Sequence, residues 1–212
     1  HRGKRTSIIP MHECTPVRRP HEPDRWICPS LLDVNYFPGS PFLPIPVDPS
    51  LWRQRERAVR FLHNGGNLGL RGHKGTRELL QAIRHLKSDL SLTIRAQDTA
   101  GFEKLLKECP WVEKDPRVSL EIGNRPYETL FRDHDVLVQP EKYNGLSLPL
   151  QEARAAGMLV MTTNRFPHNS WLPREPLIPV ASYHQARISG AYLPFEEADV
   201  DPKTIAATMD AW

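Results

Sequence analysis

Residues 135–163 read DVLVQPEKYNGLSLPLQEARAAGMLVMTT and predict a strand, a loop, a helix and a second strand, in that order. Apolar runs at 136–138 and 158–161 form the two strands, and residues 148–156 form the helix between them. The loop contains the glycine-bearing segment 143–145. A loop of this kind presents free backbone N–H groups and the positive end of a helix dipole, so it suits a phosphate or another anion.

The same alternation extends on both sides of this stretch. Three strands are expected before this stretch, at residues 59–63, 92–96 and 118–122; its own strands, at 135–139 and 158–161, are the fourth and fifth, and a sixth is expected at 177–180. Helices are expected after Thr76, which can cap the first of them, at 101–109, at 127–132, and from Asp201 towards the last residue. Strands separated by helices of about ten residues indicate an α/β fold with a doubly wound parallel sheet, Rossmann-like, which binds ligands at the carboxyl ends of its strands.

Residues 1–50 differ from the rest of the chain. Ten of the 21 prolines of the protein lie in these 50 residues, which rules out a regular helix over this length. Short strands are expected at 7–11 and 25–28, followed by a stiff proline-rich linker. We therefore expect 1–50 to be the incomplete end of a preceding domain and 51–212 to form the Rossmann-like domain. The opening letters HRGKRT suggest a start that is not the natural one.

Composition excludes several classes of protein. The 212 residues are 39% hydrophobic and 25% charged, with a net charge of +3, as in an ordinary globular protein. Three widely spaced cysteines and scattered histidines predict neither a disulfide framework nor a metal site, and favour a cytoplasmic location. No apolar run approaches the roughly 18 residues that a membrane span needs. The arginines at 53, 55, 57 and 60 give a local positive excess that suits phosphorylated ligands or nucleic acid.

Three loops are expected to converge at the carboxyl edge of the sheet. The first runs over 65–75 and carries Arg71 and Lys74, two cations that suit a diphosphate. It has neither GxGxxG nor GxxxxGK[ST] spacing, so it is not a P-loop. The second contains Asn124 and Arg125 and is either a base-binding loop or a plain turn. The third ends in a helix whose Glu152 either grips a ribose diol or is simply stabilised by the helix dipole.

Residues 140–160, PEKYNGLSLPLQEARAAGMLV, resemble the nucleotide-sugar site of retaining GT-B glycosyltransferases of the glycogen-synthase-like kind, glycosyltransferase family 4. The matching positions are Pro140, Gly145, Leu148, Pro149, Glu152, Ala153, Ala155, Gly157 and Val160. The earlier RGHKG is similar to the arginine and lysine loop of that family, and PHNSWLP is similar to a segment found in one subgroup. The resemblance covers about residues 44–212.

The resemblance implies a role for each matching residue. Arg71 and Lys74 would be catalytic, holding the donor diphosphate and stabilising the leaving nucleotide. The donor-binding set would be Asn144, Gly145, Leu146, Ser147, Glu152, Asn124 and Arg125, with Glu152 on the ribose and the N–H groups of Gly145, Leu146 and Ser147 on the sugar or the distal phosphate. No metal and no cofactor would be needed, and the co-substrate would be a UDP-sugar or GDP-sugar.

One position departs from the family pattern. The family has a glutamate eight residues before Glu152, where this chain has Asn144, which cannot be a carboxylate base. Glu141 is a candidate substitute if the loop is shifted.

Three hypotheses follow. The first is a metal-independent, retaining glycosyltransferase of the hexosyltransferase type, which acts on a glycan, lipid, protein or nucleic-acid acceptor. The second is a non-catalytic nucleotide-sugar binder or degenerate partner protein. The third is a phage-type DNA-base glucosyltransferase, supported by the basic residues alone.

Overall fold

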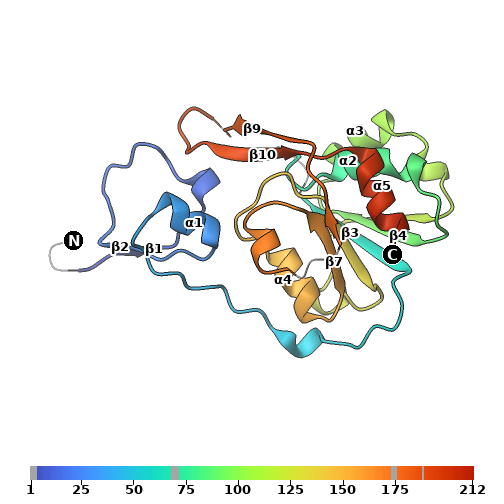
Figure 1. The fold of residues 1–212 in the computed structure, drawn as a ribbon, viewed down its shortest axis with the longest axis horizontal. Helices are drawn as coiled ribbons and strands as arrows, with labels where there is room; N and C mark the ends of the chain where they lie inside the picture. The colour runs from blue at the N-terminus through green and yellow to red at the C-terminus, as the bar shows by residue number, and fades with distance from the viewer. Residues whose placement is uncertain (1–3, 68–71, 173–175, 188) are drawn as a thin grey trace.

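The computed structural model describes residues 4–67, 72–172, 176–187 and 189–212. Its main sheet has six parallel strands in the order β5-β4-β3-β6-β7-β8, which confirms the predicted doubly wound topology (Figure 1). The strands are β3 (Arg60–Gly66), β4 (Ser91–Ala96), β5 (Val118–Ile122), β6 (Val136–Gln139), β7 (Leu159–Thr163) and β8 (Leu177–Ile178). The order reverses direction between β3 and β6, and ligands of such sheets bind outside the carboxyl ends at that reversal.

Helices cover both faces of this sheet. The first face carries α2 (Thr76–Ala82), α3 (Thr99–Glu108) and α5 (Pro202–Asp210), and the second carries α4 (Leu148–Ala155). Strand side chains alternate between the two cores, so Phe61 packs with the first group of helices while Leu62 packs with α4. Both faces of each central strand are therefore buried, which explains why these strands read as continuous apolar runs.

The start of α2 differs from the sequence prediction. Gly75, not Thr76, is the capping residue, and it has a left-handed backbone with φ +67°. Thr76 is the first helical residue, and its hydroxyl lies 2.8 Å from Nε2 of the buried His63. The predicted helix over 127–132 is also shorter, a single 3₁₀ turn at Tyr127–Thr129.

The segment before the linker forms a small separate lobe (Figure 1). Two parallel two-residue strands, β1 (Ser7–Ile8) and β2 (Arg25–Trp26), confirm the two strand predictions. The expectation that this proline-rich segment holds no helix is wrong for the proline-free residues LLDVNY, which form α1 (Leu31–Tyr36). It is capped by Ser30, whose side chain accepts a hydrogen bond from the backbone N–H of Asp33.

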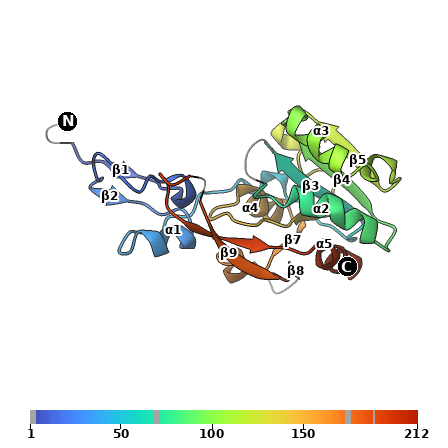
Figure 2. The same ribbon diagram turned by 90° about the horizontal axis from the view of Figure 1, so that it is seen from above.

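An antiparallel hairpin joins this lobe to the main domain. Strands β9 (Ser182–Ala186) and β10 (Phe195–Asp199) pair along their whole length, and the hairpin reaches from the sheet to α1 (Figure 2). Near its tip, the N–H of Val17 donates to the carbonyl of Ala191, and the N–H of Leu193 donates to that of Thr15. Residues 182–199 have no firm hydrophobic periodicity, so no strand was predictable there.

Arg55 fastens the linker to the domain. Its guanidinium donates hydrogen bonds to the carbonyls of Arg53, Phe131, His134 and Ala156 at 2.7–3.1 Å. Burial and the neighbouring Arg53 lower the pKa of this guanidinium. Arg55 therefore has a structural role in holding the chain between the two parts.

The buried His63 gives the fold a predictable response to acid. Val138 O can only accept, so Nδ1 carries the proton donated to it at 2.9 Å, and neutral Nε2 accepts from Thr76. Burial lowers the pKa of His63 to about 4. The unfolded chain thus binds more protons between about pH 6.5 and pH 4, and stability falls as the pH drops through this window.

His63 should contribute on the order of 3 kcal/mol to the fall in the free energy of unfolding between pH 7 and pH 4. We expect His63→Gln, which can keep both hydrogen bonds, to lose much of this contribution. Urea unfolding at a series of pH values measures it. His21→Gln, at an exposed histidine, is the control and should keep the wild-type slope. Parallel stability curves for all three proteins would refute the assignment.

Candidate functional site

The loops after β3 and β6 meet where the strand order reverses. The N–H of Lys142 donates to the carbonyl of His73 at 2.7 Å, which joins the two loops through their backbones. Lys74 Nζ lies 3.9 Å from Oε1 of Glu141, and only 17% of the Lys74 side chain is exposed. The structure therefore brings the predicted cation Lys74 to the predicted edge of the sheet and pairs it with a carboxylate on the neighbouring loop.

Glu141 is the most deeply buried acid of the site, with no exposed surface. Its second oxygen lies 3.9 Å from Nε2 of His168, which is also fully buried. Burial raises the pKa of Glu141, opposed by the positive charges of Lys74 and Arg165, and burial lowers the pKa of His168 to about 3. A neutral His168 cannot compensate the carboxylate, so Lys74 is its closest cationic partner among the described ion pairs.

Asn144 organises the third loop from within. Its Oδ1 accepts hydrogen bonds from the N–H groups of Leu146 (3.0 Å) and Ser147 (2.9 Å), and its Nδ2 donates to Glu141 at 3.4 Å. This is an Asx-type turn that leads into α4. The side chain thus needs both an acceptor and a donor, and a glutamate cannot donate to Glu141 when ionised. Two of the three N–H groups predicted to contact the donor are already satisfied by Asn144.

This geometry predicts the effect of restoring the family residue. Asn144→Glu places a second carboxylate beside the buried Glu141 and should lower the free energy of unfolding by about 1 to 3 kcal/mol. Adding Glu141→Gln should recover at least about 1 kcal/mol, because the neutral amide can donate to the new carboxylate. A thermodynamic cycle measured by urea unfolding tests this. Additive effects of the two substitutions would show that the side chains do not interact.

Glu152 lies in the second turn of α4, close to the same lysine. It is half-buried; burial raises its pKa, while the charge of Lys74 lowers it. Burial raises the pKa of Tyr127, and the negative charge of Glu152 raises it further. The end of the β5 loop is therefore near enough to Glu152 to respond to its charge. Lys74, Glu141 and Glu152 therefore share one electrostatic neighbourhood, contributed by three different segments of the chain.

The remaining predicted residues have different surroundings. Asn124 accepts a hydrogen bond from the Gln97 amide at 3.0 Å, and Arg125 Nε lies 3.6 Å from Glu121. These contacts lie along the β4–β5 edge and do not include the lysine or its two acids. Arg71 falls outside the described residues. Among the residues that the structure describes, no group of three or more His, Cys, Asp or Glu side chains is placed to hold a metal ion.

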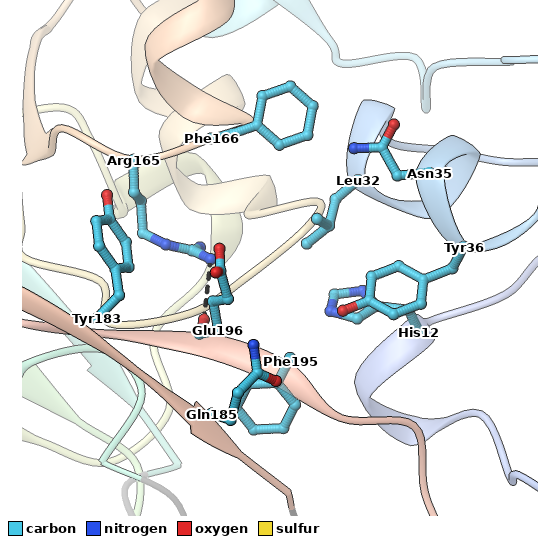
Figure 3. A pocket seen from close by; sticks show the side chains of 10 residues that line it. All are labelled: His12, Leu32, Asn35, Tyr36, Arg165, Phe166, Tyr183, Gln185, Phe195 and Glu196. Atoms are coloured by element: carbon cyan, nitrogen blue, oxygen red, sulfur yellow. Dashed lines mark hydrogen bonds between the residues drawn. The ribbon is translucent and has the colours of Figure 1, made fainter.

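Gly145 faces the N-terminal lobe. A Cβ atom at this position would lie 3.0 Å from Ser30 Oγ and 3.5 Å from two atoms of the His12 ring. His12 is 1% exposed, and its Nδ1 lies 3.1 Å from a carboxylate oxygen of Glu13. Its ring is stacked on Tyr36, with centroids 4.7 Å apart (Figure 3). The lobe therefore closes directly over the glycine of the predicted donor loop.

Sequence reasoning missed three residues that hold these parts in place. Lys142 Nζ lies 2.8 Å from Glu197 on β10 and 3.3 Å from Glu78 on α2. Arg165 is 4% exposed and donates hydrogen bonds to the carbonyls of Asn144 (3.1 Å) and Glu196 (3.3 Å). The third is His168. His168 belongs to the segment PHNSWLP, which was noted only as a family resemblance, and Arg165 lies two residues before that segment.

Comparison with known proteins supports the fold. No family model matches the chain, and no curated protein matches its sequence. Solved structures do match. A glycosyltransferase from Rickettsia africae matches with a TM-score of 0.64 at 10% identity, over 88% of this chain and 52% of that one. Anabaena Alr3699/HepE, in complex with UDP and glucose, matches with a TM-score of 0.64 at 11% identity, over 89% of this chain and 53% of that one.

The C-terminal domain of the group 1 glycosyltransferase LpcC from Francisella tularensis matches with a TM-score of 0.54 at 18% identity, over 78% of this chain and 87% of that domain. The chain thus has the fold of a GT-B C-terminal domain, as predicted, and spans about half the length of the first two structures. In the part of the chain that is described, no helix is both long and apolar enough to cross a membrane.

Proposed function

We propose that this chain is the donor-binding part of a glycosyltransferase that moves a sugar from a nucleoside-diphosphate sugar to an acceptor hydroxyl. The observation that carries the proposal is the ion pair of Lys74 with Glu141 at the reversal of the strand order, where the charge of Lys74 also lowers the pKa of Glu152. This is the place where Rossmann-like sheets bind nucleotides. The complex of Anabaena Alr3699/HepE with UDP and glucose, on a similar fold, supports the same ligand class.

Lys74 supplies the main chemical requirement of this reaction. Negative charge develops on the diphosphate as the bond to the sugar breaks, and a fixed ammonium group stabilises that charge most strongly where water is largely excluded. The buried Glu141 holds the ammonium group in position. Glu152, in the second turn of α4, would bind the ribose hydroxyls, because its two oxygens suit a diol.

Calorimetric titration of the complete protein with UDP-, GDP- and ADP-sugars tests the proposal. We expect one of these donors to bind, and to bind more weakly to Glu152→Gln, which keeps the size of the side chain but loses its charge. Glu103→Gln, on the exposed side of α3, is the matched control and should bind like the wild type. If none of the donors binds to the wild-type protein, the proposal is wrong.

A non-catalytic donor binder is the second candidate, and Asn144 favours it. Its side chain is occupied by Leu146, Ser147 and Glu141, and it carries no charge to offer to a reacting sugar. This candidate predicts donor binding without transfer and without hydrolysis of the donor. Release of nucleoside diphosphate by the complete protein, above the uncatalysed rate, would exclude it.

The DNA-modifying version loses part of its support. Arg55, one of the arginines that suggested nucleic-acid binding, is occupied by backbone carbonyls of the linker and the domain. Arg60 is paired with Asp135 at 2.7 Å. The DNA-modifying hypothesis is therefore tested by neutralising the exposed Arg53 and Arg57. Neutralising Arg55 would disturb the fold.

A further inference from the structure

A cavity of about 360 Å³ lies where the N-terminal lobe, the β9–β10 hairpin and the loop after β7 meet (Figure 3). This volume lies within the range of small-molecule sites, about 300 to 1,000 Å³. The lobe contributes His12, Leu32, Asn35 and Tyr36; the loop contributes Arg165 and Phe166; the hairpin contributes Tyr183, Gln185, Phe195 and Glu196. It adjoins the proposed donor loop, because the His12 ring lies 3.5 Å from the position that a Cβ atom of Gly145 would occupy, and Arg165 donates a hydrogen bond to the carbonyl of Asn144.

Two buried polar groups in its wall have unused hydrogen-bonding atoms. Among the described residues, Nε2 of His12 and Nε of Arg165 have no hydrogen-bond partner, whereas Nδ1 of His12 has the ion-pair contact with Glu13. Both side chains are more than nine-tenths buried, and Figure 3 shows the His12 ring and the Arg165 guanidinium facing the space between them. Buried polar groups normally find partners, so these atoms indicate a ligand with hydrogen-bonding groups of its own.

The charges in the wall favour a neutral ligand. Arg165 is its one cation, and the charges of Glu141, Glu196 and Glu13 already act on that guanidinium. The Glu196 side chain is exposed at the cavity and accepts hydrogen bonds without attracting anions. A phosphate or a nucleic-acid backbone would meet repulsion from this carboxylate.

The other lining groups suit a polyhydroxyl compound with an apolar face. Asn35 and Gln185 are exposed amides, each able to donate and to accept, as neighbouring hydroxyls require. The rings of Phe166 and Tyr183 are 39% and 48% exposed, and they lie on different sides of the cavity (Figure 3). Flat rings between hydrogen-bonding groups match the C–H face and the equatorial hydroxyls of a pyranose. A lipid chain would leave the amides and the carboxylate unpaired.

We infer that this cavity binds a sugar ring of the acceptor, so that the acceptor of the proposed transferase is a saccharide. The inference rests on the proposed function. The inference assigns a role to the hairpin. Strands β9 and β10 lie outside the six-stranded sheet and supply three lining residues, Tyr183, Gln185 and Glu196.

The test uses the complete protein saturated with UDP or GDP, whichever binds. Saturation-transfer NMR is recorded with methyl glycosides of glucose, galactose, mannose and N-acetylglucosamine, and with their disaccharides. We expect at least one to bind, and Gln185→Ala and Phe166→Ala each to weaken it about fivefold to tenfold. The affinity for the nucleoside diphosphate should change less than about twofold, which also shows that the variants are folded.

His184→Ala is the matched control. His184 lies on the same strand as Gln185 but outside the cavity lining, and it faces Glu197 and Asp199 at the surface. Saccharide binding that is equal in Gln185→Ala, Phe166→Ala and His184→Ala would overturn the inference, as would the absence of saccharide binding when the nucleotide binds. Failure of the wild-type protein to bind any nucleotide or donor would instead contradict the proposed function.

Discussion

Replacing Gly75 with alanine is expected to remove about 3 kcal/mol or more from the free energy of unfolding. The residue has a left-handed backbone, and a Cβ atom would lie 2.0 Å from the carbonyl oxygen of Pro140. The obstacle is backbone, which cannot rotate away as a side chain can. The loops after β3 and β6 would have to separate, so Lys74 and Glu141 would also move apart and donor affinity should fall with stability.

Gly72→Ala separates the two causes. Gly72 lies in the same loop with φ +57°, and no atom of the described residues lies within 4 Å of its Cβ position. This variant carries the backbone strain alone, about 1 to 2 kcal/mol. Urea unfolding of both variants, with donor binding measured alongside, checks the comparison. Equal losses in the two proteins would mean that the contact with Pro140 is not rigid.

Replacing Lys74 with alanine is expected to reduce kcat/KM for sugar transfer by about 100-fold to 1,000-fold, as when one preorganised donor to a developing anion is removed. Its ammonium group lies 3.9 Å from Glu141, and its charge also lowers the pKa of Glu152. Lys74→Arg should retain part of the activity. Lys107→Ala, at an exposed lysine of α3, is the control and should retain all of it.

A second variant distinguishes a direct role from an indirect one. If Lys74 serves only to neutralise the buried Glu141, the double variant Lys74→Met with Glu141→Gln should bind the donor normally, because no uncompensated charge remains. If Lys74 contacts the diphosphate, binding stays weak in the double variant. Calorimetric titration of the double variant with the nucleoside diphosphate distinguishes the two cases. We expect binding to stay weak.

The central sheet was predictable because its signal is local. Val136, Leu137 and Val138 are buried on both faces, so their run of apolar residues identifies the strand without knowledge of its neighbours. The hairpin gave no such signal. In β9, the first four of the five residues are exposed, and the strand is held by backbone pairing with β10 and by polar contacts such as Ser182 with Asp199 at 2.6 Å.

The residues of the candidate site that belong to a sequence motif could be predicted. The contacts that form only when distant segments fold together could not. Lys74 and Glu152 stand at recognisable positions beside strand ends. The burial of Glu141 is not visible in PEKYNG, since it results from Lys74, Arg165 and His168 converging from separate loops. Contact between residues as distant in sequence as His12 and Gly145 likewise has no local pattern to reveal it.

Strand β10 has a mechanical consequence. The N–H of Leu193, just before it, bonds to Thr15 in the lobe, and the N–H of Ala198 within it bonds to Lys142 in the loop after β6. Five residues of extended backbone span roughly 17 Å and resist stretching. The strand therefore holds the lobe and the loop after β6 at a fixed separation. As a result, the lobe cannot move away from the loop without breaking one of these two hydrogen bonds.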